Sequence, residues 1–229
     1  MRILGLIPAR GGSKGIPRKN LALLRGRPLL AWTCEAALAA QELAAVVLST
    51  DDDEIAGCGR RCGVRVPFLR PADLALDTTP SLPVVQHALK AMEALDGRYD
   101  AVCLLQPTNP LRAANDIDAA CTLFRAGGAD SVVAVRPVPA HFHPFWTYLE
   151  DAEGCLVQAA GRGVVARRQD LPPAFWREGS VYVTARDTLL EHASLYGARM
   201  QPYLVPEERC GNIDTLRDLQ EMERRMGAA

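Results

Sequence analysis

The stretch "IPARGGSKGIPRKN" (7–20) decides how the chain begins to fold, because it turns an apolar run into a polar loop. The run that leads into it, "RILGLIPA" (2–9), is rich in Ile and Leu and predicts a buried strand. Glycines, a serine and basic residues follow at once. In an open parallel sheet, ligands bind beyond the carboxyl ends of the strands. We therefore expect this loop to form part of a ligand site.

Three further apolar runs repeat the strand pattern: "AAVVLSTD" (44–51), "DAVCLLQPT" (100–108) and "DSVVAVRPV" (130–138). Segments with helical spacing lie between and after them, at 28–43, 81–95, 114–126 and from 214 onward. Continuous apolar strands that alternate with helices are typical of βαβ units. The sequence thus predicts an α/β fold with a largely parallel sheet that is covered by helices on both faces.

The composition predicts one domain over residues 1–229, because this length and a hydrophobic content of 48% suffice for one core. A net charge of -1 gives no overall basic field, so we expect neither nucleic acid nor a membrane surface as a partner. No apolar run approaches the roughly 20 residues of a membrane span, and the seven scattered cysteines are typical of reduced thiols. These features predict a cytoplasmic protein.

The segment 137–173 interrupts the alternation of strands and helices. It contains "PVPAHFHPFWTYLED" and "GRGVVARRQDLPP", with prolines, aromatics and basic residues but no helical period. A long irregular insertion in a compact domain is usually functional or an interface element. After it, "GSVYVTARDTLLE" (179–191) predicts a strand and then a helix.

The first loop has the chemistry of a phosphate cradle. Glycines let backbone N–H groups converge on phosphate oxygens, and basic side chains neutralise the charge that builds on a leaving pyrophosphate. The residues concerned are Arg10, Gly11, Gly12, Ser13, Lys14 and Lys19. The spacing fits neither GxxxxGK[ST] nor the GxGxxG fingerprint, which argues against a dinucleotide-dependent oxidoreductase. The alternative is a tight turn decorated with solvated basic residues.

Polar residues also follow the later strands. "STDDDEI" (49–55) is acidic, and we interpret it as the capped start of a helix. "LRPADLALDTTPS" (69–81) offers Arg70 and Ser81 as polar contacts, although alone it reads as a loop. "LLQPTNPLR" (104–112) ends a buried strand with Gln106, whose amide can both donate and accept.

Taken together, these blocks resemble the acylneuraminate cytidylyltransferases, the CMP-sialic acid synthetases. "IPARGGSKGIPRKNL", "RPADLALDT", "LLQPTNPLR", "RRQDLPPAF…GSVYV" and "IDTLRDL" occur in the family's order along essentially the whole chain. The resemblance implies a Rossmann-like nucleotidyltransferase fold, a three-layer αβα sandwich. It also implies CTP and Mg²⁺, release of pyrophosphate, and a homodimer in which the 137–173 insertion makes the dimer contact and borders the acceptor site.

The resemblance also implies roles for individual residues. The triphosphate loop would comprise Arg10, Gly11, Gly12, Ser13, Lys14 and Lys19, and the nucleotide pocket Asn20, Arg70 and Ser81. The acceptor would meet Gln106, Arg168 and Tyr182. Catalysis would rest on Arg10, Lys19 and Asp214, because transfer of this kind depends on positioning and charge stabilisation.

The chain departs from the family pattern in two places. Where the family typically has two aspartates for Mg²⁺, this chain has Asn212, Ile213 and Asp214, which leaves Asp214 as the single carboxylate ligand. Asp214 can also be interpreted as a helix N-cap, a role that is compatible with metal ligation. "WREG" (176–179) places Arg177 and Glu178 where neutral residues are common, which leaves the acceptor open.

The sequence therefore predicts a cytidylyltransferase that transfers CMP from CTP to an acidic acceptor, a sugar acid of the nonulosonic or sialic type. The alternatives are the same chemistry on a 3-deoxy-octulosonic acid or a small phosphonic acid, or a non-catalytic nucleotide-binding homologue. No side chain stands out as a general base, since Gln106 does not take up a proton near neutral pH.

Overall fold

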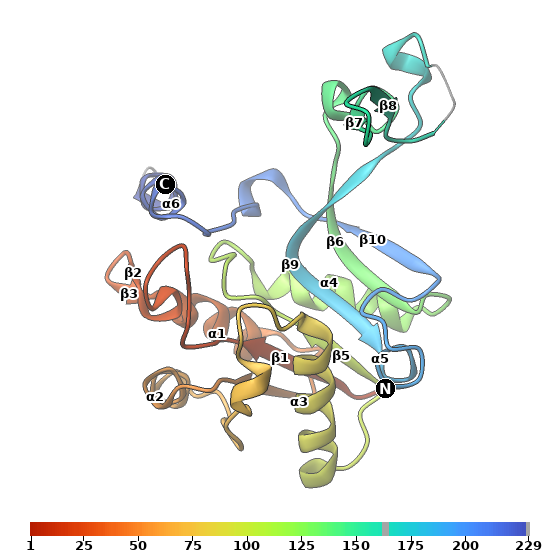
Figure 1. The fold of residues 1–229 in the computed structure, drawn as a ribbon. Coiled ribbons are helices and arrows are strands. Elements are labelled where there is room, and N and C mark those ends of the chain that lie inside the picture. The colour runs from red at the N-terminus through yellow and green to blue at the C-terminus, as the bar shows by residue number, and fades with distance from the viewer. Residues whose placement is uncertain (162–164, 228–229) are drawn as a thin grey trace. The chain divides into compact units, whose positions relative to one another are not determined.

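The computed structural model describes residues 1–161 and 165–227, which divide into two compact units (Figure 1). Unit 1 comprises Met1–Ala134 and Gly179–Ala229, and unit 2 comprises Val135–Glu178. Strands β6 (Ser131–Pro137) and β9 (Phe175–Ala185) each run from one unit into the other. Unit 2 thus contains the irregular segment 137–173 with a few residues on either side.

Unit 1 is built on a six-stranded sheet in the order β10-β6-β9-β5-β1-β4. β1 (Ile3–Pro8) pairs in parallel with β4 (Ala45–Ser49) and with β5 (Ala101–Leu104). The mostly parallel sheet predicted from the sequence is confirmed, but β9 runs antiparallel to β5. β10 (Met200–Leu204) escaped prediction because it is an edge strand with alternating exposure and an internal proline, the position in which proline is tolerated.

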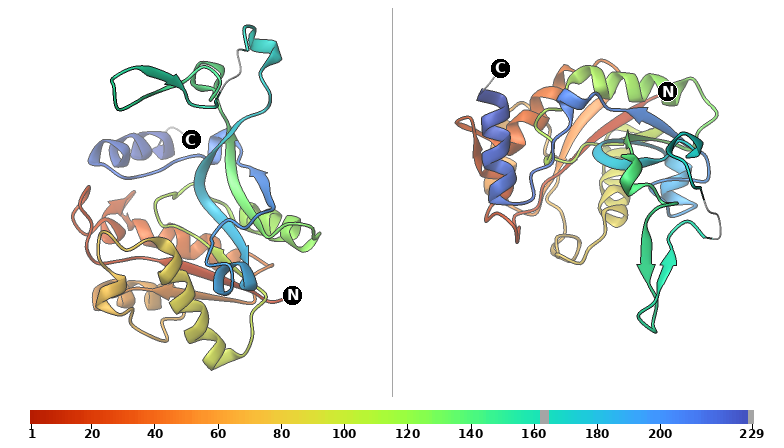
Figure 2. Two further views of the ribbon diagram at one scale, coloured as in Figure 1. Left: turned by 45° about the vertical axis from the view of Figure 1, so that its right-hand side comes forward. Right: turned by 90° about the horizontal axis from the view of Figure 1, so that it is seen from above.

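Helices cover both faces of this sheet, which confirms the predicted three layers (Figure 2). One layer holds α1 (Leu29–Ala39), α2 (Asp53–Arg61) and α4 (Ala114–Arg125), and the other holds α3 (Ser81–Asp96) and α5 (Arg186–Leu190). The central strands are accordingly apolar on both sides. Ile3, Leu4, Leu6 and Ile7 of β1 are all fully buried.

The first residues of α2 and α6 show which of the predicted acidic N-caps are present. The Asp52 carboxylate accepts hydrogen bonds from the amides of Glu54 and Ile55, which confirms the capped start predicted for α2. The last helix, α6, spans Leu216–Gly227. There Thr215 and Asp218 cap each other's backbone amides, so the interpretation of Asp214 as the N-cap is wrong. The Asp214 carboxylate is thereby left for the pocket described below.

Short elements complete the chain. β2 (Leu23–Leu24) pairs with β3 (Arg27–Pro28), and β7 (Tyr148–Glu150) pairs with β8 (Leu156–Gln158) as a hairpin of unit 2. The 3₁₀ turns are η1 (Lys19–Leu21), η2 (Ala72–Leu74), η3 (Ala140–Phe142), η4 (Arg168–Asp170) and η5 (Glu207–Arg209). No helix in the described residues is long and apolar enough to cross a membrane.

A buried acid anchors the segment that leads to α6. Asp116, 1% exposed, accepts hydrogen bonds from the Tyr203 hydroxyl at 2.6 Å and from the Arg209 Nε at 2.9 Å. Burial, with the bond to Asp116, raises the pKa of Tyr203 to about 12. The Arg209 carbonyl in turn accepts from the Asn109 amide at 3.3 Å. Because a buried charge that loses its partner is costly, this network fixes where the chain turns toward Asn212.

Candidate active site

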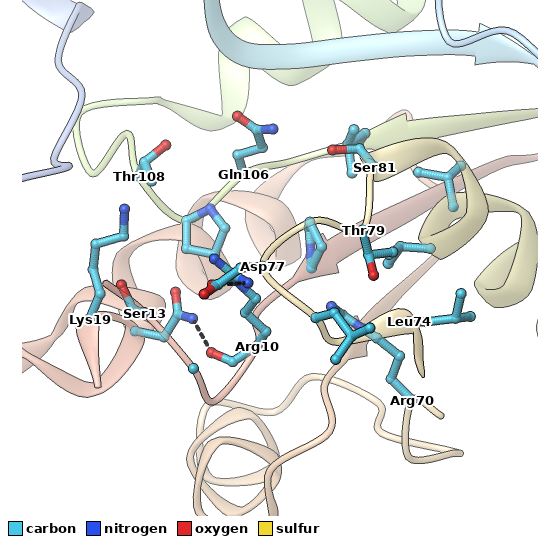
Figure 3. A pocket seen from close by; sticks show the side chains of 18 of the residues that line it. Arg10, Ser13, Lys19, Arg70, Leu74, Asp77, Thr79, Ser81, Gln106 and Thr108 are labelled. Atoms are coloured by element: carbon cyan, nitrogen blue, oxygen red, sulfur yellow. Dashed lines mark hydrogen bonds and ion pairs between the residues drawn. The ribbon is translucent and has the colours of Figure 1, made fainter. Parts of the chain in front are cut away.

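A pocket of about 380 Å³ opens in unit 1 where β1 and β5 end (Figure 3). It has a cationic part and an apolar part. The lining residues that carry the argument are Arg10, Gly12, Ser13, Lys19, Asn20, Arg70, Leu74, Asp77, Thr79, Ser81, Val84, Gln106, Asn212 and Asp214. Figure 3 shows Lys19 and Ser13 on one side, Arg70 and Leu74 on the other, and Arg10 with Asp77 between them.

The loop after β1, which we call the phosphate loop (10–19), is held by close backbone contacts. A Cβ at Gly15 would overlap the carbonyl oxygen of Asp214, and a Cβ at Gly11 would lie 2.8 Å from Asp52 Oδ2. The Gly11 N–H donates to Asp51 Oδ1 at 3.0 Å, and the Asn20 amide donates to the Arg10 carbonyl at 2.9 Å. Gly15 is therefore required by the approach of a backbone carbonyl, whereas a Cβ at Gly11 would need the Asp52 side chain to shift.

The Gly11 amide was predicted to face phosphate, and here it is engaged by Asp51. Sequence reasoning missed this role because "STDDDEI" was interpreted only as a helix start. The signal that could have found it is the end of β4, which neighbours β1 in the sheet. A polar side chain directly after β4 lies within reach of the loop that follows β1.

Two cations of the phosphate loop share one carboxylate. Asp77 Oδ1 lies 2.5 Å from Arg10 Nη1, and Asp77 Oδ2 lies 3.0 Å from Lys14 Nζ. The hydrogen bond from Lys14, with that from Arg10, holds the pKa of Asp77 below its usual range. Asp77 was not among the predicted site residues, since an acid is not expected beside cations that are predicted to bind phosphate.

The other two catalytic candidates, Lys19 and Asp214, are far apart in the sequence but form an ion pair. Lys19 Nζ lies 2.8 Å from Asp214 Oδ1, although the two residues are 195 positions apart, and it also donates to the Ile213 carbonyl at 3.0 Å. The Asn212 amide donates to Asp214 Oδ2. The Lys19 side chain is 16% exposed and that of Asp214 60%, so the carboxylate remains open to the pocket and to solvent.

The apolar part of the pocket combines aliphatic and hydroxyl side chains. Leu74, Val84 and Leu104 line it, together with the hydroxyl residues Thr79 and Ser81. Apolar walls with a few fixed polar groups are typical of small-molecule sites.

Arg70 closes this part of the pocket. It is 6% exposed and donates through Nε to Ser49 Oγ at 3.1 Å and through Nη2 to the Ser49 carbonyl at 2.5 Å. Burial, and to a smaller extent the charge of Arg10, lowers the pKa of Arg70 to about 10. The guanidinium is therefore still charged at neutral pH, and it is held rigidly against β4.

Gln106 is positioned by an arginine that sequence reasoning did not single out. Arg112, 4% exposed, donates to the Gln106 carbonyl at 3.1 Å, to the Ser180 carbonyl at 2.5 Å and to Thr33 Oγ1 at 2.6 Å. One buried guanidinium thus joins the loop after β5 to β9 and α1. Its position in "LLQPTNPLR" gave no hint of the two distant partners, Ser180 and Thr33.

The structure brings most of the predicted site residues together. Nine of them line the pocket: Arg10, Gly12, Ser13, Lys19, Asn20, Arg70, Ser81, Gln106 and Asp214. Gly11 and Lys14 belong to the same loop. Tyr182 is the register partner of Leu104 in the sheet, and its hydroxyl and Gln106 Oε1 would each lie 3.7 Å from a Cβ at Gly179. Arg168 lies in η4 of unit 2, and its role stays a prediction.

The fold and the pocket define a nucleotidyltransferase. The structure is similar to the solved structure of a CMP:2-keto-3-deoxy-manno-octonic acid synthetase complexed with CTP, with a TM-score of 0.74 and 17% sequence identity. The match covers 100% of this chain and 99% of the synthetase chain. That likeness shows the fold. The sequence pattern of the cytidylyltransferase family matches residues 4–223, and the chain belongs to this family.

Relatives of known name are similar over nearly the whole chain. A CMP-N,N'-diacetyllegionaminic acid synthase of Legionella pneumophila is 37% identical over 90% of this chain and 87% of its own. A pseudaminic acid cytidylyltransferase of Campylobacter jejuni is 31% identical over 96% of this chain and 94% of its own. The resemblance stated from the sequence is confirmed, and the protein is a CTP-dependent nucleotidyltransferase.

Lys19→Ala and Arg10→Ala are each expected to lower turnover by about 10²-fold or more, because each removes a charge that faces the developing negative charge. Steady-state release of pyrophosphate from CTP measures this effect, with the melting temperature as a check on the fold. Lys90→Ala, at an exposed lysine of α3, is the matched control. Near-normal turnover in either site variant would contradict the assignment of the phosphate loop.

Proposed function

We propose that this cytidylyltransferase transfers CMP from CTP to a nonulosonic acid and releases pyrophosphate. The observation that carries the proposal is a single pocket with two parts. One part is the cationic loop, and the other is the apolar part, where Arg70 and Ser81 add polar groups. The sequence relatives support a nonulosonic acid as acceptor, since they are named for legionaminic and pseudaminic acid. A 3-deoxy-octulosonic acid has weaker support, because that structural neighbour is only 17% identical.

In this proposal each part of the pocket takes one part of the reactants. The triphosphate lies on the phosphate loop against Arg10, Ser13, Lys14 and Lys19. The nucleoside occupies the compartment of Asn20, Arg70 and Ser81. The acceptor meets Gln106 and Tyr182 of unit 1. Arg168 of unit 2 stays a separate candidate for the sugar carboxylate, because the fork of an arginine binds both oxygens.

The reaction is an in-line attack of the acceptor's anomeric hydroxyl on the α-phosphorus. Arg10 and Lys19 neutralise the charge that the leaving pyrophosphate gains, and the two compartments hold the reacting atoms in line. The two carboxylates among the described lining residues, Asp77 and Asp214, are both ion-paired. Positioning and charge stabilisation therefore account for the catalysis in this proposal, with no side chain assigned as the base. A cytoplasmic location goes with it, since CTP is supplied there.

We further propose Mg²⁺ as the cofactor, held by Asp214. Mg²⁺ in nucleotide sites takes one or two carboxylates together with phosphate oxygens and water. The exposed carboxylate of Asp214, beside the neutral amide of Asn212, fits this donor set. Among the described residues, no group of three or more His, Cys, Asp or Glu side chains could hold a metal ion, so phosphate oxygens and water would have to supply the other ligands. When bound, Mg²⁺ offsets the charge of the phosphates.

We also propose that unit 2 forms a homodimer contact. Its described surface exposes large apolar side chains at Phe142, Tyr148, Leu149, Leu156, Val157, Phe175 and Trp176. Leu149 and Val157 are register partners on β7 and β8, which form an isolated two-stranded hairpin. Such a hairpin is marginal in water by itself, so a second copy of the chain that covers these side chains would stabilise it.

The acceptor is identified by measuring pyrophosphate release from CTP and Mg²⁺ with a panel of acids. We expect release with a nonulosonic acid of the legionaminic, pseudaminic or neuraminic type, and little with ketodeoxyoctulosonate or small phosphonates. Release with a phosphonate alone would mean that the site has a different acceptor. If no acid in the panel causes pyrophosphate release although CTP still binds, the result would favour the alternative that the protein is a non-catalytic nucleotide-binding homologue.

The magnesium proposal is tested with Asn212→Asp. A second carboxylate beside Asp214 is expected to lower the Mg²⁺ concentration for half-maximal activity several-fold, because it adds a negative charge to the metal's ligands. A magnesium titration of the rate gives this value. Asn115→Asp adds the same charge on an exposed residue of α4 and serves as the control. An unchanged titration in Asn212→Asp would place Asn212 outside the metal's surroundings.

The dimer is tested by charging the hairpin. Leu149→Asp combined with Val157→Asp is expected to convert the protein to a monomer, because two carboxylates would be buried without partners. Sedimentation equilibrium measures the mass, and Leu95→Asp, at an exposed leucine of α3, is the control. A dimer that withstands the double substitution would show that the contact lies elsewhere.

A further inference from the structure

The Asp77 carboxylate is ion-paired with two of the cations to which the triphosphate is proposed to bind. Its two carboxylate oxygens are divided between Arg10 at 2.5 Å and Lys14 at 3.0 Å, and it lines the pocket. Figure 3 shows its side chain beside that of Arg10 in the middle of the site. A carboxylate with two cations has the same arrangement as a bound phosphate group, which also presents several oxygens to such side chains.

The loop around Asp77 does not depend on this carboxylate. The Thr79 N–H donates to the Leu76 carbonyl at 3.1 Å, and Thr79 Oγ1 donates to the Asp73 carbonyl at 3.0 Å. These bonds close the turn between η2 and α3. The Asp77 carboxylate takes no part in these bonds, and its ion pairs are with Arg10 and Lys14 of the phosphate loop.

We infer that Asp77 is a positioning residue that stands in for the triphosphate, holding Arg10 and Lys14 in place until phosphate oxygens replace it. The inference rests on the proposed binding of the triphosphate to these two residues. It has two consequences. The cations remain directed into the pocket without ligand, and each ligand that binds them must displace a carboxylate.

The displacement makes binding selective for charge. Exposed ion pairs contribute about 0 to 1 kcal/mol, so a triphosphate with several negative charges can replace Asp77 readily. A ligand without the β- and γ-phosphates makes no use of Arg10 and Lys14 in this proposal. Asp77 therefore weakens the binding of CTP and pyrophosphate, and so assists the release of the product pyrophosphate, but leaves the binding of CMP unchanged.

The test is Asp77→Asn, which keeps the shape of the side chain and removes its charge. We expect the dissociation constants of CTP and of inorganic pyrophosphate to fall by about 5-fold, the ratio equivalent to an ion pair at the upper end of this range, while that of CMP stays the same. Calorimetric titration at one fixed Mg²⁺ concentration and without acceptor measures all three. Asp73→Asn removes a charge from the same loop outside the pocket lining and is the matched control.

Two outcomes would overturn the inference. One is unchanged or weaker binding of CTP and pyrophosphate in Asp77→Asn, and the other is a loss of thermal stability with equal effects on all three ligands. The double variant with Arg10→Ala tests the coupling, because the gain from Asp77→Asn should shrink once Arg10 is absent. If Arg10→Ala alone leaves the affinity for pyrophosphate unchanged, it is the assignment of the triphosphate that fails, whatever Asp77→Asn does.

Discussion

The contact between the phosphate loop and the segment before α6 is the constraint on which the site depends. Gly15 lies against the carbonyl oxygen of Asp214, and Lys19 is ion-paired with the Asp214 carboxylate. The two ends of unit 1 thereby meet, and the candidate metal ligand comes to lie beside the triphosphate cations. Any side chain at position 15 would push these segments apart. The Ile213 N–H, which donates to the Thr108 carbonyl at 2.9 Å, ties the same segment to the loop after β5.

Three cations of the phosphate loop are ion-paired in the structure, although they share only two carboxylates. Arg10 and Lys14 share Asp77, and Lys19 is paired with Asp214. In the binding mode proposed above, a nucleotide exchanges these partners: phosphates take over the cations and the carboxylates are released. The more exposed pairs of Asp77 contribute about 1 kcal/mol or less each, so their exchange has a low cost while the side chains stay ordered. Arg70 differs, because it is buried and keeps its bonds to Ser49.

What the sequence could predict is what depends on neighbours along the chain. The apolar strands, the helices between them and the capped start of α2 all follow from local patterns, and their outlines are confirmed. What it could not predict depends on approach in space. Asp51, Asp77 and Arg112 act on partners at least 40 positions away in their principal contacts, apart from the bond of Arg112 to the nearby Gln106 carbonyl. The antiparallel β9 likewise depends on how the chain returns from unit 2.

The neutral Asn212 is the feature that most separates this pocket from the family pattern, and its surroundings give it a physical rationale. Asp214 is flanked by Lys19 on one oxygen and by the Asn212 amide on the other. A second carboxylate at position 212 would face Asp214 at close range without an ion, and like charges so placed repel. With an amide there, Asp214 has partners in the absence of metal, and the proposed Mg²⁺ would have to rely more on the phosphates. The metal and the nucleotide would then bind as one unit, which couples the cofactor to the substrate through the choice of a single side chain.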